Sequence, residues 1–312
     1  MSTLPDHEPE CRETASPCFD LVIEGRTRSI GSMTVARLLP SPKRRLIGPF
    51  IFLDHMGPIE LAPGVGFDVL PHPHIGLSTV TYFLSGENVH RDSLGTIQTN
   101  RPGDVNLMTA GRGVVHSERA EPAWRERGGV MHGIQMWLAL PAPNEDDAPS
   151  FEHHPAASLP AFTLSAGARG RVLIGSGYGV SSPIRHPSQP LLIDLELDTG
   201  ASIELPHSGD PSAAFERGVF VVSGELTGGG QPLTSDRLAV VVPGLRVSLI
   251  ARTPSRVLVV GGPAMGPRFI DWNFVASSKE RIDRARDAWK AQTFPKIPGD
   301  DREFVPYPEL RK

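Results

Sequence analysis

Apolar positions along the chain come in short runs that end at turn residues. In the first half these runs include FDLVIEG, FIFLDHMG, LSTVTYFLSG and GIQMWLALP, and in the second half RVLIGSG, LLIDLELD, GVFVVSGE and RVLVVGG. Short apolar runs bounded by Gly, Pro, Asp or Ser are typical of strands. The 32 glycines and 31 prolines are spread along the sequence, which favours many short strands joined by turns. The pattern therefore predicts an all-β protein.

A polar stretch interrupts this pattern near the middle of the chain. Residues 141–162 read PAPNEDDAPSFEHHPAASLPAF, and their Pro, Ala and acidic residues are typical of a surface connection. A chain of 312 residues more often forms two domains than one. We expect a first β-barrel over residues 1–145, a linker over 146–165, and a second barrel over 166–312 that ends in a helix and a tail.

The two halves share a short motif. A strand pattern ends in Ser-Gly-Glu at 85–87 and again at 223–225, and a Pro-Gly pair follows at 102–103 and at 243–244. We interpret this as an internal duplication, with a chance match of two β motifs as the alternative. Measured back from Gly86 and Gly224, the positions that match His72 and His74 are Asp210 and Ser212. The second half therefore lacks the histidine pair of the first.

One segment has helical rather than strand periodicity. Residues 277–292 begin with Ser277 and Glu280, which have the spacing of a capping box. An apolar stripe at helical spacing follows, made of Ile282, Ala285, Ala288 and Trp289. We expect a surface helix that packs on a barrel, followed by a tail laid over the surface.

The charge and the cysteine content indicate which cellular environment and which partners to expect. The net charge is −4 and the basic residues are scattered, so neither nucleic acid nor a membrane surface is expected as a partner. The two cysteines, Cys11 and Cys18, are interpreted as reduced thiols rather than as a disulfide or metal ligands. The first twenty residues lack the apolar core of a signal peptide, and no apolar run is long enough to cross a bilayer. We expect a soluble, cytoplasmic monomer.

The candidate chemistry begins with PHPHIG at residues 71–76. In a strand His72 and His74 point to the same face, and the flanking prolines favour a strand edge or a bulge. His116 and Glu118 repeat this spacing in TAGRGVVHSE. Two adjacent strands with such pairs turned inward would bring three imidazoles and one carboxylate together, a donor set that suits a divalent first-row metal. A packing or surface role is the alternative for either pair taken alone.

Other histidines and glycines receive simpler interpretations. We expect His90 to be solvated in a turn, His132 to be packed or exposed rather than close to the metal, and His153 and His154 to lie in the linker without a ligand. The glycines of TAGRGVVHSE are not followed by the helix and Lys-Ser/Thr of a phosphate loop. Gly111 and Gly113 are therefore expected to form a turn that aims His116 inward.

Several stretches together resemble the pirin family of the cupin superfamily. They are FIFLDHMG, PHPHIGLSTVTY, HRDSLG, RPGDVNLMTAGRGVVHSE and HGIQMWLAL, and the resemblance is strong over residues 20–140 and weaker beyond them. It implies a bicupin with one metal ion in the N-terminal barrel and none in the C-terminal barrel. Ser78 and Thr79 stand where other cupins have a glutamate soon after His-x-His, as in pirins. Carried over by motif, the metal ligands are His72, His74, His116 and Glu118, and the expected ion is iron(II).

The resemblance implies two different functions. Some pirins cleave flavonols such as quercetin with dioxygen and release carbon monoxide, and in that hypothesis Glu118 takes the proton of the 3-hydroxyl group. Others are regulators without enzymatic activity that bind a transcription factor or a metabolic enzyme and use the metal as a redox sensor. A third possibility is a different metal-dependent cupin reaction on a small polar molecule. For a flavonol, the expected apolar pocket residues are Phe52, Phe83, Met108 and Trp137, each of which could instead belong to the barrel core.

Overall fold

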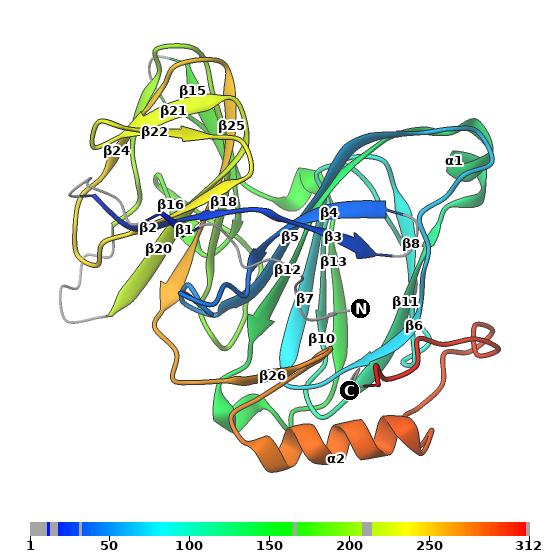
Figure 1. Cartoon of the computed structure of the whole chain (residues 1–312). Coiled ribbons are helices and arrows are strands. Elements are labelled where there is room, and N and C mark those ends of the chain that lie inside the picture. The colour runs from blue at the N-terminus through cyan, green and yellow to red at the C-terminus, as the bar shows by residue number, and fades with distance from the viewer. Residues whose placement is uncertain (1–10, 13–17, 31–32, 165–166, 208–213, 310–312) are drawn as a thin grey trace.

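The computed structural model describes residues 11–12, 18–30, 33–164, 167–207 and 214–309. It contains two β-barrels side by side, with one helix along the outside of the first (Figure 1). The first barrel consists of a seven-stranded sheet and a four-stranded sheet. In spatial order the larger sheet is β13 (Ser150–His154), β10 (Val105–Thr109), β7 (Leu77–Ser85), β12 (Gly129–Ala139), β5 (Phe50–Leu61), β4 (Met33–Leu39) and β3 (Arg26–Ile30). The smaller sheet is β6 (Val69–His74), β11 (Val114–Ala120), β8 (Asn88–Asp92) and β9 (Ile97–Asn100).

The second barrel consists of an eight-stranded sheet and a four-stranded sheet. The larger one is β1 (Cys11–Arg12), β2 (Phe19–Glu24), β23 (Arg237–Val241), β20 (Phe215–Ser223), β25 (Ser255–Pro263), β18 (Leu191–Leu197), β15 (Ala168–Ile174) and β14 (Ala161–Leu164). The smaller one is β19 (Ser202–Glu204), β24 (Ser248–Ala251), β21 (Glu225–Gly228) and β22 (Gln231–Thr234). Short elements complete the chain: β16 (Ser176–Gly177), β17 (Val180–Ser181), β26 (Phe269–Asp271), β27 (Phe274–Ala276), α1 (Pro122–Arg127), α2 (Lys279–Lys290) and the 3₁₀ turns Ala142–Asn144 and Ala156–Ser158.

The strand order confirms two barrels of the same design. The order β10-β7-β12-β5 in the first barrel corresponds to β23-β20-β25-β18 in the second, and β6-β11-β8-β9 corresponds to β19-β24-β21-β22. Gly86 and Gly224 both follow the central strand with positive φ, so the two Ser-Gly-Glu turns are equivalent. The Pro-Gly pairs are not equivalent, because Pro102–Gly103 precedes β10 whereas Pro243–Gly244 follows β23.

The second barrel has apolar side chains at the described positions that correspond to the metal-binding strands of the first. On β24, the counterpart of β11, Leu249 and Ala251 are buried among aliphatic side chains, and Ile203 of β19 joins the same cluster. The two positions that the sequence comparison matched to the histidine pair, Asp210 and Ser212, lie outside the described residues. A second barrel without metal therefore stays a prediction.

The ends of the chain are exchanged between the barrels, which corrects the predicted domain limits. Residues 19–24 were placed in the first barrel, but β2 pairs with β23 of the second. The segment that follows β25 was placed in the second barrel, but β26, β27 and α2 pack on the first (Figure 1). The predicted linker also contributes strands, since β13 pairs with β10 and β14 pairs with β15. These segments are short, and a local pattern of apolar residues indicates a strand or a helix without indicating which sheet it joins.

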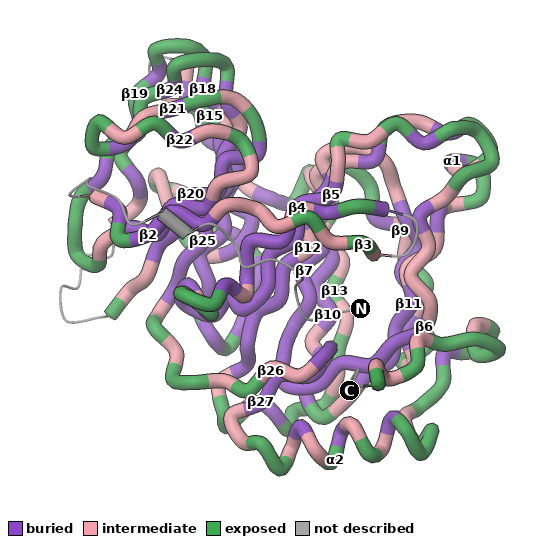
Figure 2. The backbone as a smooth tube through the Cα atoms, in the orientation of Figure 1, coloured by how far each residue is buried: buried purple, intermediate pink, exposed green. Residues whose placement is uncertain are grey.

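The outer faces of the two large sheets pack against each other. Leu53, Val80 and Met136 of the first barrel share one buried cluster with Phe220, Leu238 and Leu258 of the second, and Figure 2 shows this continuous buried region between the barrels. A polar contact lies within it: the Tyr82 hydroxyl donates to Asp194 Oδ2 at 2.6 Å, and Arg256 Nη2 donates to the same oxygen at 2.6 Å.

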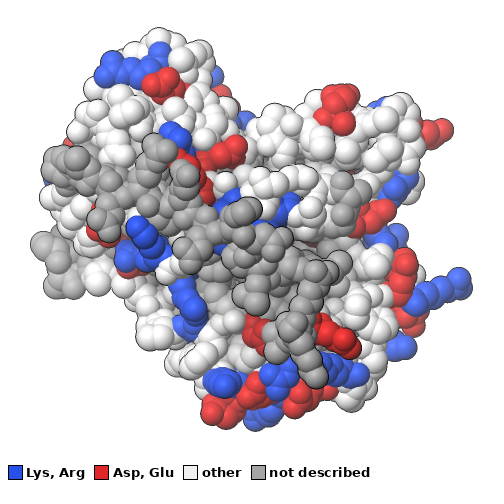
Figure 3. All heavy atoms as spheres, viewed as in Figure 1, with Lys and Arg blue, Asp and Glu red and all other residues white. Residues whose placement is uncertain are grey.

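Helix α2 lies where the periodicity predicted it, with a different cap. Ser278, rather than Ser277, is the N-cap and accepts a hydrogen bond from the backbone N–H of Arg281. Ser277 instead donates its N–H and its hydroxyl to the buried carboxylate of Glu145. Ile282, Ala285 and Trp289 are buried against the first barrel, as the stripe predicted. Around α2, acidic and basic side chains are interspersed (Figure 3), and no helix of the described residues is long and apolar enough to cross a membrane.

Candidate metal centre

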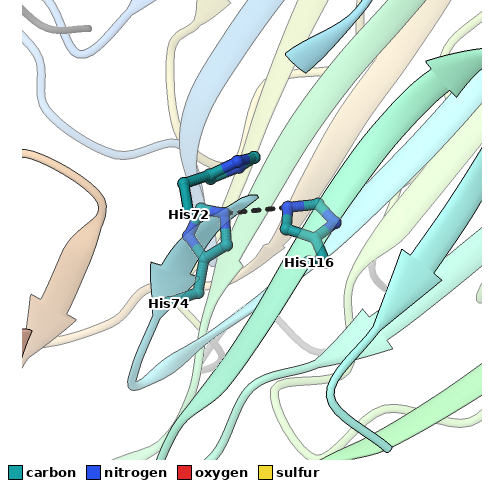
Figure 4. Close-up of side chains that lie close together, drawn as sticks. All are labelled: His72, His74 and His116. Atoms are coloured by element: carbon teal, nitrogen blue, oxygen red, sulfur yellow. Dashed lines mark hydrogen bonds between the residues drawn. The ribbon is translucent and has the colours of Figure 1, made fainter. Parts of the chain in front are cut away.

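Strands β6 and β11 lie next to each other at one side of the first barrel. β6 is the edge strand of its sheet, as expected for a strand with Pro71 and Pro73, because proline cannot donate to a neighbouring strand. The antiparallel register places His116 directly opposite His72. His72, His74 and His116 are all buried and converge inside the barrel (Figure 4).

The three imidazoles are close enough to share one ion. One ring nitrogen from each residue lies within 4.8 Å of the other two. His74 Nε2 and His116 Nε2 are 3.2 Å apart. The ring centroids are 4.4 Å apart for His72 and His116, and 5.0 Å apart for His74 with each of the other two.

The hydrogen bonds on the far side of two rings fit a bound cation. His72 Nδ1 donates to the carbonyl oxygen of Leu70 at 2.8 Å, and His74 Nδ1 donates to that of Asn273 at 3.0 Å. Each Nε2 then carries a lone pair directed into the cluster, the arrangement typical of metal-binding histidines. Burial lowers the pKa of all three imidazoles, that of His72 to about 4. Neutral rings with converging lone pairs are the donor set that a divalent metal requires.

Asn273 reaches the cluster from the other end of the chain. It lies in the turn between β26 and β27, next to Trp272, whose φ is 54°. Positive φ is uncommon for a bulky residue, and here the Trp272 ring is held by Phe274 and Tyr307, with ring centroids 5.5 Å away in both cases. The segment after the second barrel therefore orients a histidine of the first.

His90 corrects one prediction. It was expected to be solvated in a turn, but it lies on β8 with only 5% of its surface exposed. Its Nε2 is 2.9 Å from Asp92 Oδ2, and its Nδ1 is 3.4 Å from Nδ1 of His116. His90 and Asp92 are two residues apart, the same spacing that identified His116 and Glu118 as sharing one face of a strand. The sequence therefore already indicated that His90 and Asp92 point to the same face. We infer that Asp92 orients His90 and that His90 orients His116.

Glu118 is near the cluster without belonging to it. A register shift separates it from His116 on β11, and its carboxylate is outside the group of nitrogens that lie within 4.8 Å of one another. It lines the same cavity as the three histidines. Burial raises the pKa of Glu118 to about 7, and a hydrogen bond with Thr81 opposes this rise. Its predicted roles as fourth ligand and as base therefore stay predictions.

The cluster opens into a cavity of about 110 Å³ inside the barrel. Of the four expected pocket residues, Phe52 and Trp137 line it, and their rings stack with centroids 4.0 Å apart. Phe83 and Met108 instead belong to buried core clusters. Ile270, Trp272 and Val305 from the C-terminal segment complete the wall.

The remaining histidines and glycines take structural roles. His132 Nε2 is 2.8 Å from Nε2 of His55, whose Nδ1 contacts Asp236 between the two barrels. His153 Nδ1 contacts the amide oxygen of Asn106 at 2.7 Å, so β13, not a free linker, holds it. Gly111 has φ 49° and lies against the carbonyl of Asp147, which excludes a side chain there and agrees with the predicted turn.

Comparison with known proteins identifies the family. The model of the family described as "Pirin" matches residues 32–138, and that of the "Pirin C-terminal cupin domain" matches residues 192–295. A pirin-like protein of Caulobacter vibrioides is 43% identical over 93% of this chain and 100% of its own length. The chain belongs to the pirin family.

Solved structures of pirins and related proteins share the fold. A crystal structure of a quercetin 2,3-dioxygenase from Acinetobacter baumannii aligns with a TM-score of 0.85 and 35% identity, covering 93% of this chain and 95% of the other. The bacterial pirin YhhW of Escherichia coli, solved in complex with nickel(II), aligns with a TM-score of 0.61 over 77% of this chain and 96% of its own. At 18% identity this second likeness concerns the fold alone.

Proposed function

We propose that this pirin is a metal-dependent dioxygenase that cleaves flavonols such as quercetin with dioxygen and releases carbon monoxide. The observation that carries the proposal is the position of three buried, converging imidazoles at the end of an aromatic-walled cavity. Similarity to the Acinetobacter baumannii quercetin 2,3-dioxygenase supports it. We propose iron(II) as the resident ion, held by His72, His74 and His116 with Glu118 as the fourth ligand. Such an ion acts as a Lewis acid toward a bound oxygen.

The side chains of the cavity have separate tasks in this proposal. The carboxylate of Glu118 accepts the proton of the flavonol 3-hydroxyl group, since it is the carboxylate of the cavity wall that has no arginine bound to it. The stacked rings of Phe52 and Trp137 provide an apolar wall for a planar ligand. Trp272 and Val305 add apolar surface to the wall from the C-terminal segment.

The size of the cavity requires a movement before a flavonol enters. Pockets for ligands of this size have volumes of about 300–1,000 Å³, and the cavity measures about 110 Å³. The wall that can yield without breaking a sheet is the tail, since Val305 is attached through single hydrogen bonds to Pro71 and Trp289. We expect the tail to move outward on ligand entry.

The decisive experiment is oxygen uptake with quercetin by protein purified anaerobically and loaded with iron(II). Uptake that releases carbon monoxide and is lost in His74→Ala would support the proposal. Glu118→Gln should lose turnover more completely than it loses metal, whereas Glu152→Gln, on the surface, should behave as the parent protein. A metal-replete protein that consumes no oxygen across a panel of flavonols would contradict the proposal and favour a regulatory role.

A further inference from the structure

A row of polar side chains crosses the inner face of the seven-stranded sheet. The register pairs Arg37 with Asp54, Asp54 with Gln135, and Gln135 with Thr81. Hydrogen bonds follow the same row: Arg37 donates to Asp54, and the Thr81 hydroxyl donates to Gln135 Oε1 at 2.9 Å. Arg37, Asp54 and Gln135 all line the cavity. The rows on either side are apolar, with Phe52 and Trp137 on one side and Met56 on the other.

One of the three guanidinium nitrogens of Arg37 has no hydrogen-bond partner among the described residues. Its Nε and Nη2 donate to the two carboxylate oxygens of Asp54 at 2.8 and 2.7 Å. The described residues give the remaining nitrogen, Nη1, no hydrogen-bond partner, although the side chain as a whole is only 6% exposed. Nη1 itself keeps accessible surface, and Arg37 lines the cavity, so this N–H group is available to an acceptor on a molecule that enters the cavity. Gln135 similarly has its amide N–H₂ group left after Oε1 accepts from Thr81.

Stacked rings separate these donors from the metal ligands. The guanidinium carbon of Arg37 lies 4.4 Å from the centroid of the Phe52 ring. The ring centroids of Phe52 and Trp137 are 4.0 Å apart in a stacked arrangement. Those of Trp137 and His74 are 5.1 Å apart in an edge-to-face arrangement. The wall therefore runs from the histidines through two aromatic rings to a cationic donor, so a planar ligand held by the metal extends toward Arg37.

Stability alone does not account for this ion pair. Replacing a buried ion pair by apolar residues often leaves the free energy of unfolding unchanged or raises it. A contribution to folding stability therefore does not explain why an arginine is buried in an aromatic wall, and ligand binding is the alternative. A site that donates to an oxygen of its ligand rejects an analogue without that oxygen, because the donor is then buried unpaired.

We propose that Arg37, supported by Gln135, binds a second oxygen of the substrate at the end away from the three histidines. This inference rests on the proposed function and makes it narrower. The substrate class is a planar aromatic molecule with a metal-binding oxygen at one end and a carbonyl or acidic hydroxyl oxygen at the other. Arg37 is thus a specificity-determining residue.

The test compares two flavonols that differ at one oxygen, 3-hydroxyflavone and 3,7-dihydroxyflavone. Both are titrated into zinc-loaded protein, because zinc has no redox chemistry and binding is then measured without turnover. Quenching of tryptophan fluorescence reports the dissociation constants. We expect 3,7-dihydroxyflavone to bind at least about tenfold more tightly, the effect of one hydrogen bond to a charged group. In the double variant Arg37→Gln/Asp54→Asn, which removes both charges together, the ratio should fall below about twofold.

Two further variants make the outcome unambiguous. Arg169→Gln removes an exposed arginine that is also paired with carboxylates and should keep the parent ratio. Arg37→Lys retains the positive charge beside Asp54 but lacks the second N–H₂ group of the guanidinium. The ratio of the two dissociation constants should therefore also fall close to one, and this variant keeps the test valid even where the double variant does not fold.

The outcomes separate this inference from the proposed function. A parent protein that binds both flavonols equally, binds neither, or keeps its ratio in the Arg37 variants would overturn the inference. A ratio that depends on Arg37 in a protein without oxygen uptake would support the inference and contradict the dioxygenase proposal. Turnover of both flavonols, bound with equal affinity, would support the dioxygenase proposal and contradict the inference about Arg37.

Discussion

The contact of Asp92, His90 and His116 makes a sharp prediction about metal affinity. Asp92 Oδ2 accepts a hydrogen bond from His90 Nε2, so the lone pair of His90 Nδ1 accepts one from the N–H of His116 Nδ1. The lone pair of His116 then lies on Nε2, which faces the cluster. Asp92→Asn retains Oδ1, which accepts from the backbone N–H groups of Leu94 and Thr96, but it puts an N–H₂ group where Oδ2 was.

The substitution moves the N–H proton to the other ring nitrogen in both His90 and His116. His90 Nε2 must then accept, so its Nδ1 carries the proton and donates to His116, which places the proton of His116 on Nε2, the atom needed for the metal. Changing such partners of metal-binding histidines typically costs about 10–100-fold in affinity, or about 1.4–2.8 kcal/mol. We expect a loss in this range, with little change in thermal stability because the backbone contacts remain.

Competition with a zinc chelator at pH 7.5 measures the affinity, and ¹H–¹⁵N correlation spectra of the metal-free protein report the histidine tautomers. Asp104→Asn is the matched control: Asp104 also accepts from two backbone N–H groups and lies near His153, which is not part of the cluster. An Asp92→Asn variant that binds zinc as tightly as the parent protein, while His116→Ala does not bind it, would refute a role of Asp92 in orienting His116.

Three further predictions concern stability. Trp289→Ala removes a buried ring between α2 and the first barrel and should lower the free energy of unfolding by about 3–5 kcal/mol in urea titrations; a loss below 1 kcal/mol would mean that α2 is not part of the cooperative unit. Tyr82→Phe removes a hydrogen bond to Asp194 between the barrels and should cost about 1.5–3 kcal/mol by the same assay, so an unchanged midpoint would count against this contact. Burial raises the pKa of Asp300, but hydrogen bonds from Arg119 and Ser117 outweigh it and lower the pKa, so the tail should be held above about pH 4 and released as the pH falls further; hydrogen exchange should show this release, and Asp300→Asn should show it already at pH 7.

Alternation of side chains was sufficient to predict that three histidines come together inside the barrel. His72, His74 and His116 form the cluster because each lies on the inner face of a strand, and a period of two is visible in any sequence. The same rule applied to His90 and Asp92 would have predicted a second inward pair. The adjacent charged residues Arg91 and Asp92 favoured a solvated turn instead, so the missing information was the length of β8.

Other features of the site depend on contacts that no local pattern encodes. Arg37 and Asp54 are ordinary charged residues in the sequence, and only the pairing of β4 with β5 makes them a buried pair in the cavity wall. The apolar alternation of β5 and β7 was equally clear for Phe52 and Phe83, yet the cavity includes the first and leaves the second in the core. Which inward residue borders a cavity depends on how two sheets close, and this is a property of the whole barrel.

The exchange of chain ends has a consequence for biosynthesis. His74 donates to the carbonyl of a residue that lies 199 positions further along the chain, and β2 needs β23 to form its sheet. A nascent chain emerging from the ribosome at about 5–20 residues per second can therefore neither complete the second barrel nor place Asn273 beside His74 before most of the protein has been translated. We expect the proposed metal ion to bind tightly only after Asn273 has been translated, when its carbonyl can orient His74.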